Sequence, residues 1–408
     1  MLTLETSIQQ LLKVVLQNTK INDLISALPE LGRTVALAVG VDLVDRLQDE
    51  LWLRLRRGEA ELVCTRCGVV HSGKSGLVRR GFRARKLKTS TGVLQFRLHQ
   101  VTCCCDRTWS PFAEWLGLKP RQRYSEELER KLTQWVTEFP YAKTCAVADD
   151  YMGATLSPMS LHAAVQRRGA AVRFTPATEC AVVQADGTKV PAGPNPRGTD
   201  VWLSLQILGR TQEHGRTKVI KRIAGWGIGS RGWEQALPAG TAGEEIVTDR
   251  EKGVAEWIRD AHPEALHGLC EWHLPHTLDH FLLLDGVKVR QREPYVRKLC
   301  EILSGPLERR REAYTAFTQS VAWPKARRLL EGAAASMLYD QPRAERTTSI
   351  IEREMREINR RTDVGVRWSV SGVNHMLRLR HSKRINPDDF ERVWSTVQKP
   401  VFSMVPLN

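Results

Sequence analysis

The sequence predicts a multidomain protein in which an α/β domain is combined with all-helical segments. Its 408 residues exceed what one hydrophobic core usually organises, so two or three domains are expected. Residues 178–273 alternate strand-like and helix-like runs in the order β-β-β-α-β-α-β, whereas residues 274–340 show helical periodicity almost throughout. A last long helix is expected over 344–361. An all-helical stretch therefore separates the α/β pattern from its final helix.

The part of the chain before the α/β pattern divides into three segments. Residues 1–60 carry apolar residues at three- and four-residue spacing and are predicted to be helical. Residues 61–117 contain short alternating runs, of which VLQFRLHQV is the clearest strand. Residues 118–175 return to helix, with Ser125 as a predicted N-cap. They end in two short helices around a Gly-containing turn, which suggests either a helix-turn-helix or an ordinary antiparallel helix pair.

The chain is strongly basic, with a formal net charge of +15. An excess of this size favours a polyanionic partner, most commonly nucleic acid, although a basic composition can also serve solubility alone. No apolar run approaches the roughly 18 residues of a membrane-spanning helix. The N-terminal residues also lack the pattern of a signal peptide. We therefore expect a cytoplasmic protein with a nucleic-acid partner and no membrane association.

Nine cysteines are present, and five of them fall into two groups, the pair Cys64 and Cys67 and the run at 103–105. In a cytosolic protein this clustering favours a metal over disulfides. A C-x-x-C turn places two thiolates on one tetrahedral metal ion, and a second pair after an intervening β-hairpin would complete a zinc ribbon. Four cysteines leave no open position for catalysis, so the expected Zn²⁺ is structural. The alternative is a reduced cysteine cluster without metal.

The second pair of zinc ligands has to come from the triple cysteine. Cys103 and Cys105 are the preferred pair, because alternate residues of a strand point to the same side. Cys104 is the usable substitute, and His71 is a weaker ligand candidate.

Two aspartates follow predicted strands, Asp186 at the end of CAVVQAD and Asp249 at the end of EIVTD. An aspartate in this position is often only a turn starter. Polar groups at the carboxyl ends of neighbouring strands nevertheless converge on one site in an α/β sheet. Paired carboxylates that share ions are what a two-metal phosphoryl-transfer site needs, and Mg²⁺ prefers carboxylate oxygen. The two aspartates therefore predict a magnesium site.

A third carboxylate is expected from the helix in ERTTSIIEREMREINRRTD, residues 345–363. Its apolar residues recur at three- and four-residue spacing and mark the side that packs on the sheet. Glu352 borders this stripe and is modestly favoured by position, and Glu354 is its rival.

Three blocks of the sequence resemble the catalytic blocks of DDE transposases of the Mutator type and their bacterial insertion-sequence relatives. The blocks are ADG after a strand, VTDREKGVAEWIRDAHPEALHGLCEWHL, and TTSIIEREMREINRRT. The middle block is the most specific, because it holds Asp249, Gly253, Pro263 and a C-x-x-H pair in the order of that family. The last block has the Ser-x-x-Glu form at Ser349 to Glu352. The resemblance covers roughly residues 178–380.

The resemblance implies a ribonuclease H-like catalytic core interrupted by an all-helical insertion. On this basis the core spans 176–280 and 341–408, and the insertion spans 281–340. Asp186, Asp249 and Glu352 would be the catalytic triad and would hold two Mg²⁺ ions. The C-x-x-H pair, Cys270 and His273, would lie near the site, but two ligands do not make a closed metal site and we do not expect them to bind one.

The resemblance also extends to an N-terminal zinc ribbon followed by a helix-turn-helix, and it implies recognition of terminal inverted repeats. The expected activity is Mg²⁺-dependent DNA strand cleavage and strand transfer by a homodimer or larger oligomer associated with the bacterial nucleoid. The expected DNA-contacting side chains are Arg353, Arg356, Arg360, Arg361, Arg167 and Arg168. Two alternatives stay open, a domesticated DNA-binding regulator without catalysis and a ribonuclease H-type nuclease that does not join strands.

Overall fold

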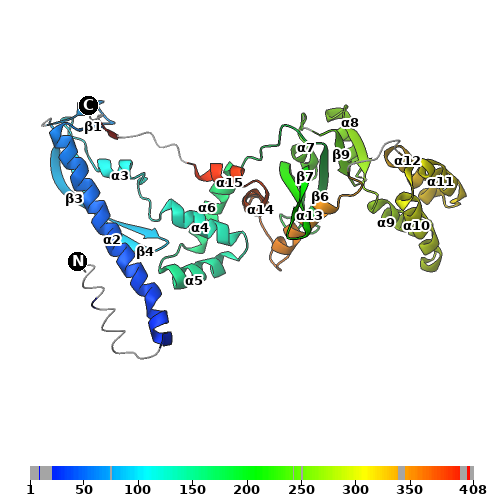
Figure 1. Ribbon diagram of the computed structural model, residues 1–408, viewed down its shortest axis with the longest axis horizontal. Helices are drawn as coiled ribbons and strands as arrows, with labels where there is room; N and C mark the ends of the chain where they lie inside the picture. The colour runs from blue at the N-terminus through cyan, green and yellow to red at the C-terminus, as the bar shows by residue number, and fades with distance from the viewer. Residues whose placement is uncertain are drawn as a thin grey trace. The chain divides into compact units, whose positions relative to one another are not determined.

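The computed structural model describes residues 9, 21–73, 76–241, 243–249, 251–338, 345–395 and 402–404. It is a mixed α/β structure with about half of its residues in helices (Figure 1). The chain forms two compact units, Met1–Val165 with Trp394–Asn408, and Gln166–Val393. The predicted helix before residue 21 and most of the predicted C-terminal tail lie outside the described residues. None of the helices in the described ranges combines the length and the apolar character needed to cross a bilayer.

The first unit begins with the long helix α2 (Ile21–Arg57), which confirms helix for the described part of the predicted segment 1–60. Two small antiparallel sheets follow, with the orders β11-β1-β2 and β3-β4-β5. Their strands are β1 (Ala60–Val63), β2 (Val70–His71), β3 (Val78–Thr89), β4 (Gly92–Thr102), β5 (Thr108–Trp109) and β11 (Phe402–Met404). The predicted strand VLQFRLHQV lies within β4. Leu62, Leu98 and Phe112 are fully buried where α2, these sheets and the next helix meet.

Four helices complete this region, α3 (Pro111–Trp115), α4 (Glu126–Val136), α5 (Tyr141–Met152) and α6 (Pro158–Ala171). Ser125 caps α4 as predicted, because its side chain accepts a hydrogen bond from the Leu128 amide. Gly153 ends α5 in the left-handed conformation, at a φ of 61°, where glycine carries no steric penalty. The division between the two units falls inside α6, within the segment 118–175 that the sequence groups as one domain.

The second unit is built on a five-stranded mixed sheet of the order β10-β9-β6-β7-β8. Its strands are β6 (Val182–Val190), β7 (Thr199–Glu213), β8 (Arg216–Ile228), β9 (Glu245–Thr248) and β10 (Leu266–Leu269). The strands β6, β7 and β8 form an antiparallel meander, whereas β9 and β10 run parallel to β6. The helices α7 (Gly232–Ala236) and α8 (Lys252–Ala261) connect the later strands, so the predicted order β-β-β-α-β-α-β is confirmed.

A helical segment follows β10 and has a hydrophobic core of its own. It consists of α9 (His273–Leu284), α10 (Val289–Ser304), α11 (Leu307–Ser320) and α12 (Pro324–Met337). Leu278, Leu299 and Leu330 are fully buried in this core. Residues 339–344, which the sequence assigns partly to this segment, lie outside the described residues.

The chain then returns to the sheet through α13 (Ser349–Thr362), and α14 (Val370–Ile385) and α15 (Pro387–Trp394) follow. A buried ion pair links the helical segment to the start of α13. Glu271 accepts hydrogen bonds from Arg310 of α11 at 2.7 Å and from Arg346, just before α13, at 2.7 Å. The buried Glu271 carboxylate thus has a guanidinium partner on each oxygen, from the buried Arg310 and the more exposed Arg346, and this contact fixes how the segment joins the sheet.

Candidate functional site

Asp186 and Asp249 lie at the same level of neighbouring parallel strands. In the register of β6 with β9, Val182 is opposite Glu245 and Gln184 is opposite Val247. The same offset relates Asp186 to Asp249, which directly follows β9. Adjacent strands are about 4.8 Å apart, so the two carboxylates share one small region of the sheet. The sequence prediction that these aspartates converge is consistent with this register.

The position of Asp186 within its strand differs from the prediction. The sequence places it at the end of a strand, but β6 continues for four residues to Val190. The strand β9 stops earlier, while β6 stays paired with β7 along its whole length. Asp186 therefore lies where β6 passes the end of its parallel neighbour, and this long-range pairing is not visible in the local sequence.

Gly187, the glycine of the ADG motif, allows the side chain of Trp202 to pack closely against β6 beside Asp186. A Cβ atom at Gly187 would lie 2.8 Å from the ring of Trp202 on β7, so a larger residue would force the strands apart. The amide of Gly187 also donates a hydrogen bond of 2.8 Å to the Asp186 carboxylate. Gly187 thus helps to orient the carboxylate that precedes it.

Glu352, rather than Glu354, is the glutamate of α13 that lies close enough to act on Asp186. Its carboxylate contributes to the electrostatic field at Asp186, accepts a hydrogen bond of 2.9 Å from Thr348 and lies 3.8 Å from the His273 ring. Glu354 is buried elsewhere on α13, where it accepts a hydrogen bond of 2.8 Å from Lys221 of β8. The choice of Glu352 over its rival, which position along the helix favoured only modestly, therefore agrees with the geometry.

Alternate residues of β6 have polar side chains, and those of Gln184 and Thr188 form hydrogen bonds with α13. Gln184 donates a hydrogen bond of 2.9 Å to the Thr347 carbonyl and accepts one of 3.0 Å from the Ile351 amide. Two positions beyond Asp186, Thr188 exchanges hydrogen bonds with Asn359 near the other end of α13. The sequence analysis missed Gln184, although its period-two spacing from Asp186 places both side chains on one face of the strand.

The two aspartates are not readily ionised together in the absence of a cation. Burial, followed by the nearby charge of Asp249, raises the pKa of Asp186 to about 7. Burial also raises the pKa of Asp249. Clustered buried carboxylates with raised pKa values are typical of sites that hold divalent cations or transfer protons.

Cys270 and His273 join the acidic cluster at its open side. Cys270 directly follows β10, and its sulfur accepts a hydrogen bond of 3.3 Å from the Thr348 amide at the start of α13. Burial opposes ionisation of this thiol, but hydrogen bonds from His273 and Thr348 lower its pKa. The Cys270 sulfur in turn raises the pKa of His273 to about 9, and the charges of Glu352 and Asp186 act in the same direction.

A cavity of about 690 Å³ opens beside Asp249 and His273. Its opposite wall belongs to the helical segment, where Phe281 of α9 and Arg328 of α12 line it. The volume lies within the range of pockets that accept small organic ligands. Asp249 and His273 therefore border a space that can accept a group of this size.

The arginines expected to contact DNA fall into two groups. Arg353, Arg356 and Arg360 of α13 are exposed, and so is Arg167 of α6. Arg361 is different, because it is buried with its guanidinium over the ring of Trp368, at 5.2 Å from the ring centre. This burial disfavours the prediction of Arg361 as a DNA contact, because a phosphate would have to reach a side chain covered by the protein. Arg168 is half-buried and donates a hydrogen bond of 2.9 Å to the Val393 carbonyl.

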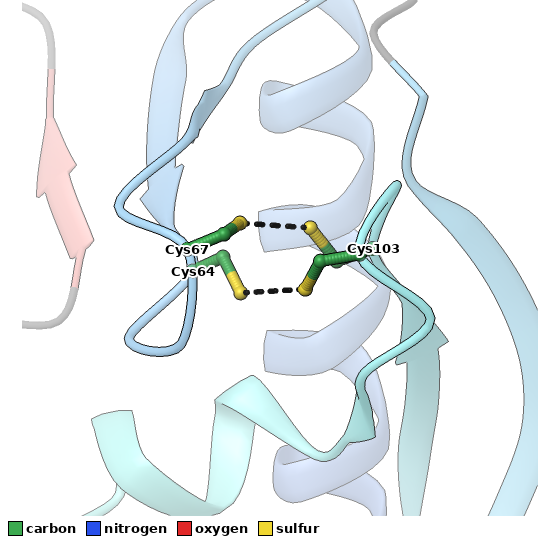
Figure 2. Close-up of side chains that lie close together, drawn as sticks. Cys64, Cys67 and Cys103 are labelled. Atoms are coloured by element: carbon green, nitrogen blue, oxygen red, sulfur yellow. Dashed lines mark hydrogen bonds between the residues drawn. The ribbon is translucent and has the colours of Figure 1, made fainter.

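The first unit contains a compact four-cysteine cluster formed by Cys64, Cys67, Cys103 and Cys105. Their sulfur atoms all lie within 4.8 Å of one another, which is close enough for one metal ion. Figure 2 shows that the C-x-x-C turn points its thiols toward the residues after β4. Burial opposes ionisation of Cys64, but hydrogen bonds from the Cys67 and Arg66 amides lower its pKa to about 6. The predicted ligand set can thus hold a structural metal ion.

The two substitute ligands lie at the edge of this cluster. The sulfur of Cys104 is 3.6 Å from that of Cys103, and Cys104 is exposed. The Nε2 atom of His71 lies 3.1 Å from the Cys103 sulfur. Both fit a supporting position around the four cysteines.

No protein-family model matches the chain, and no curated protein sequence matches it.

Proposed function

We propose that this chain is a DDE transposase that cleaves DNA at the ends of its element and joins those ends to target DNA. The observation that carries the proposal is that Asp186 and Asp249 lie level on adjacent strands while the charge of Glu352 acts on Asp186. The first two come from adjacent parallel strands, and the third comes from α13, which packs on the same strand as Asp186. Three carboxylates from these elements are the donor set of a two-metal phosphoryl-transfer site.

The arrangement of the second unit supports a ribonuclease H-like core. An antiparallel meander continues into parallel strands, and α13 packs against β6 after a helical segment with its own core. In this proposal the helical segment is an insertion that forms the far wall of the cavity beside Asp249.

The donor atoms of the acidic cluster fit Mg²⁺, which prefers oxygen ligands. Asp186, Asp249 and Glu352 would hold two such ions, whose chemistry is activation of a water or a DNA 3′-hydroxyl and stabilisation of the leaving 3′-oxygen. The protein's own contribution is to hold the three carboxylates in place. Gln184 and Thr348 fix the start of α13 and the Glu352 carboxylate, and Gly187 orients Asp186.

The remaining parts of the chain would hold the DNA. The net charge of +15 favours a polyanion, and Arg353, Arg356 and Arg360 lie exposed on α13. In the first unit the four-cysteine cluster would bind Zn²⁺ and stabilise a ribbon that recognises the element ends together with α5 and α6. Two ends have to be brought together, so a dimer or larger assembly is part of the proposal.

The proposal is tested by cleavage of labelled duplexes that carry the DNA flanking the coding sequence. We expect Mg²⁺-dependent nicks with 3′-hydroxyl ends from the wild type and a loss of at least about 100-fold in the Glu352→Gln variant. The matched control is Glu301→Gln, which changes an exposed glutamate of α10 that pairs with Lys298. DNA binding without any cleavage by the wild type would instead support a non-catalytic regulator.

A further inference from the structure

We infer that Cys270, His273 and Glu352 form a second metal site, one suited to a borderline transition-metal ion such as Zn²⁺ and distinct from the four-cysteine cluster. The site shares Glu352 with the acidic cluster. An ion bound there would therefore withdraw Glu352 from Asp186 and Asp249.

The geometry brings three donor atoms of different kinds to one point. A sulfur of Cys270, a ring nitrogen of His273 and a carboxylate oxygen of Glu352 all lie within 4.8 Å of one another. The nitrogen Nε2 of His273 is 3.8 Å from the Glu352 oxygen. These residues come from the end of β10, the first turn of α9 and the first turn of α13, so their positions are set by three separate elements.

The donor set discriminates between metals. Sulfur and imidazole nitrogen are preferred by Zn²⁺ and Co²⁺, whereas Mg²⁺ prefers oxygen ligands alone. Three protein ligands with a fourth position open to solvent or substrate are typical of a zinc site that is not purely structural. The site therefore differs in chemistry both from the neighbouring carboxylates and from the closed four-cysteine cluster.

The backbone around Cys270 holds its sulfur in a fixed orientation. Cys270 is buried, and its sulfur accepts the backbone hydrogen bond from Thr348. Backbone N–H groups that donate to a ligand sulfur are supporting interactions of the kind that orient metal ligands. Thr348 is the N-cap residue of α13, and Glu352 lies in the first turn of the same helix. The amide that supports the Cys270 sulfur and the Glu352 ligand therefore belong to one local structure.

The sequence alone could not indicate this site. The C-x-x-H spacing supplies two ligands, which do not close a metal site. The third ligand lies 79 positions further along the chain than His273 and reaches it only because α13 packs on β6 after the helical segment. Only the folded arrangement shows that Glu352 completes the set.

The site is tested by titrating the full chain, loaded with a single equivalent of Zn²⁺ that fills the four-cysteine cluster, with Co²⁺ while the absorption of cobalt bound to thiolate is recorded. We expect one Co²⁺ to bind with a sulfur-to-cobalt band while the four-cysteine cluster keeps its zinc, which a zinc-sensitive dye monitors. Cys270→Ser should abolish the band, and His273→Asn and Glu352→Gln should each weaken Co²⁺ binding by about tenfold or more. Cys300→Ser, which changes an exposed cysteine of α10, is the matched control and should leave the band unchanged.

Two outcomes overturn the inference. One is a wild-type chain that shows no sulfur-to-cobalt band while its cluster remains zinc-loaded. The other is a band that persists in Cys270→Ser with circular dichroism equal to that of the wild type. If Cys270→Ser does not fold, the His273→Asn and Glu352→Gln variants decide, because unchanged cobalt affinity in both excludes the site.

The effect on activity rests on the proposed function and is measured separately. Because Glu352 is shared, micromolar Zn²⁺ should inhibit Mg²⁺-dependent cleavage in the wild type, and Cys270→Ser should relieve the inhibition. Cobalt binding is read without DNA, so failure of the proposed function leaves the metal titration interpretable. If the chain binds cobalt but zinc does not inhibit cleavage, the metal site stands. The idea that Glu352 serves both the metal site and catalysis would then be excluded.

Discussion

Asp186 carries the largest electrostatic cost in the acidic cluster. Burial, with the charge of Asp249, raises its pKa from the ordinary 3.8 to about 7. Between these two values the folded chain retains a proton that the unfolded chain has already lost. The free energy of unfolding therefore falls as the pH rises through this window. Above it, an ionised Asp186 destabilises the fold unless a cation is bound.

The variant Asp186→Asn should consequently be more stable than the wild type at pH 8 without added divalent cations. We expect a gain of about 1–3 kcal/mol in the free energy of unfolding, measured by urea denaturation. The gain should shrink as the pH falls toward 3.8, and added Mg²⁺ should reverse the order. Asp260→Asn, at an exposed position, is the control. A difference that is the same at both pH values would contradict the electrostatic explanation.

Substitutions of Glu352 and Glu354, which lie two residues apart, should have different effects: the first should impair cleavage and the second should lower stability. Glu352→Gln should change the free energy of unfolding by about 1 kcal/mol or less, because the side chain is only half-buried. Glu354→Gln should lower it by about 3 kcal/mol, because it leaves Lys221 without its buried partner.

Denaturation curves and cleavage assays on the two variants check this pair of expectations. Glu354→Gln should retain cleavage at temperatures where it is folded, whereas Glu352→Gln should not. The reverse pattern would show that Glu354 is the catalytic carboxylate.

The helix α13 depends on β6 for the capping of its first turn. Its N-cap residue, Thr348, makes no side-chain capping bond to the helix, and its hydroxyl donates to Glu352 instead. Gln184 takes over the capping role by accepting from the Ile351 amide. A strand residue two positions from Asp186 thus sets the register of the helix that carries Glu352.

Replacing Gln184 should therefore disturb catalysis more than a comparable change at the far end of α13. We expect Gln184→Met to raise the Mg²⁺ concentration needed for half-maximal cleavage and to cost about 1–3 kcal/mol of stability, since two buried backbone groups lose their partner. Gln184→Glu keeps the acceptor for Ile351 and should restore part of the Mg²⁺ affinity.

The control for this prediction is Thr188→Val, which removes the bond to Asn359 on the same face of β6. It should lower stability without changing the Mg²⁺ requirement. Equal Mg²⁺ requirements in Gln184→Met and the wild type would exclude a positioning role for Gln184.

The elements of the second unit were predictable because each carries its own local periodicity. The order β-β-β-α-β-α-β and the helical run after β10 follow from alternation and from three- and four-residue spacing. The burial of Arg361 also follows this spacing, since it lies three residues beyond the buried Ile358. Its partner Trp368 and the Lys221 partner of Glu354 are distant contacts that no local pattern reveals.

At the scale of the whole molecule, the two units should depend on metals in different ways. Cys64 and Cys103 are part of the hydrophobic core of the first unit. Loss of a bound ion there would therefore disrupt the packing of this core as well as the metal site. The carboxylates of the second unit repel one another without a cation but belong to a sheet with an independent core. Removal of metal should therefore unfold one unit and leave the other folded.

This difference is measurable by hydrogen exchange after treatment with a strong zinc chelator. Protection should be lost in β1 to β5 and retained in β6 to β8, because binding energy at a four-cysteine site is also folding energy. Cys67→Ser should reproduce the effect without chelator, whereas Cys300→Ser should not. Protection that survives chelation in both units would argue that the cysteine cluster needs no metal.

The central claim is that Asp186, Asp249 and Glu352 form a site that both cleaves and joins DNA. The most direct measurement incubates the full chain with Mg²⁺, labelled duplexes carrying the DNA that flanks the coding sequence, and an unlabelled plasmid. The account predicts labelled ends covalently joined to plasmid by the wild type, and no joined product from Glu352→Gln. Cut ends without any joined product would contradict it and identify a nuclease of the ribonuclease H type instead.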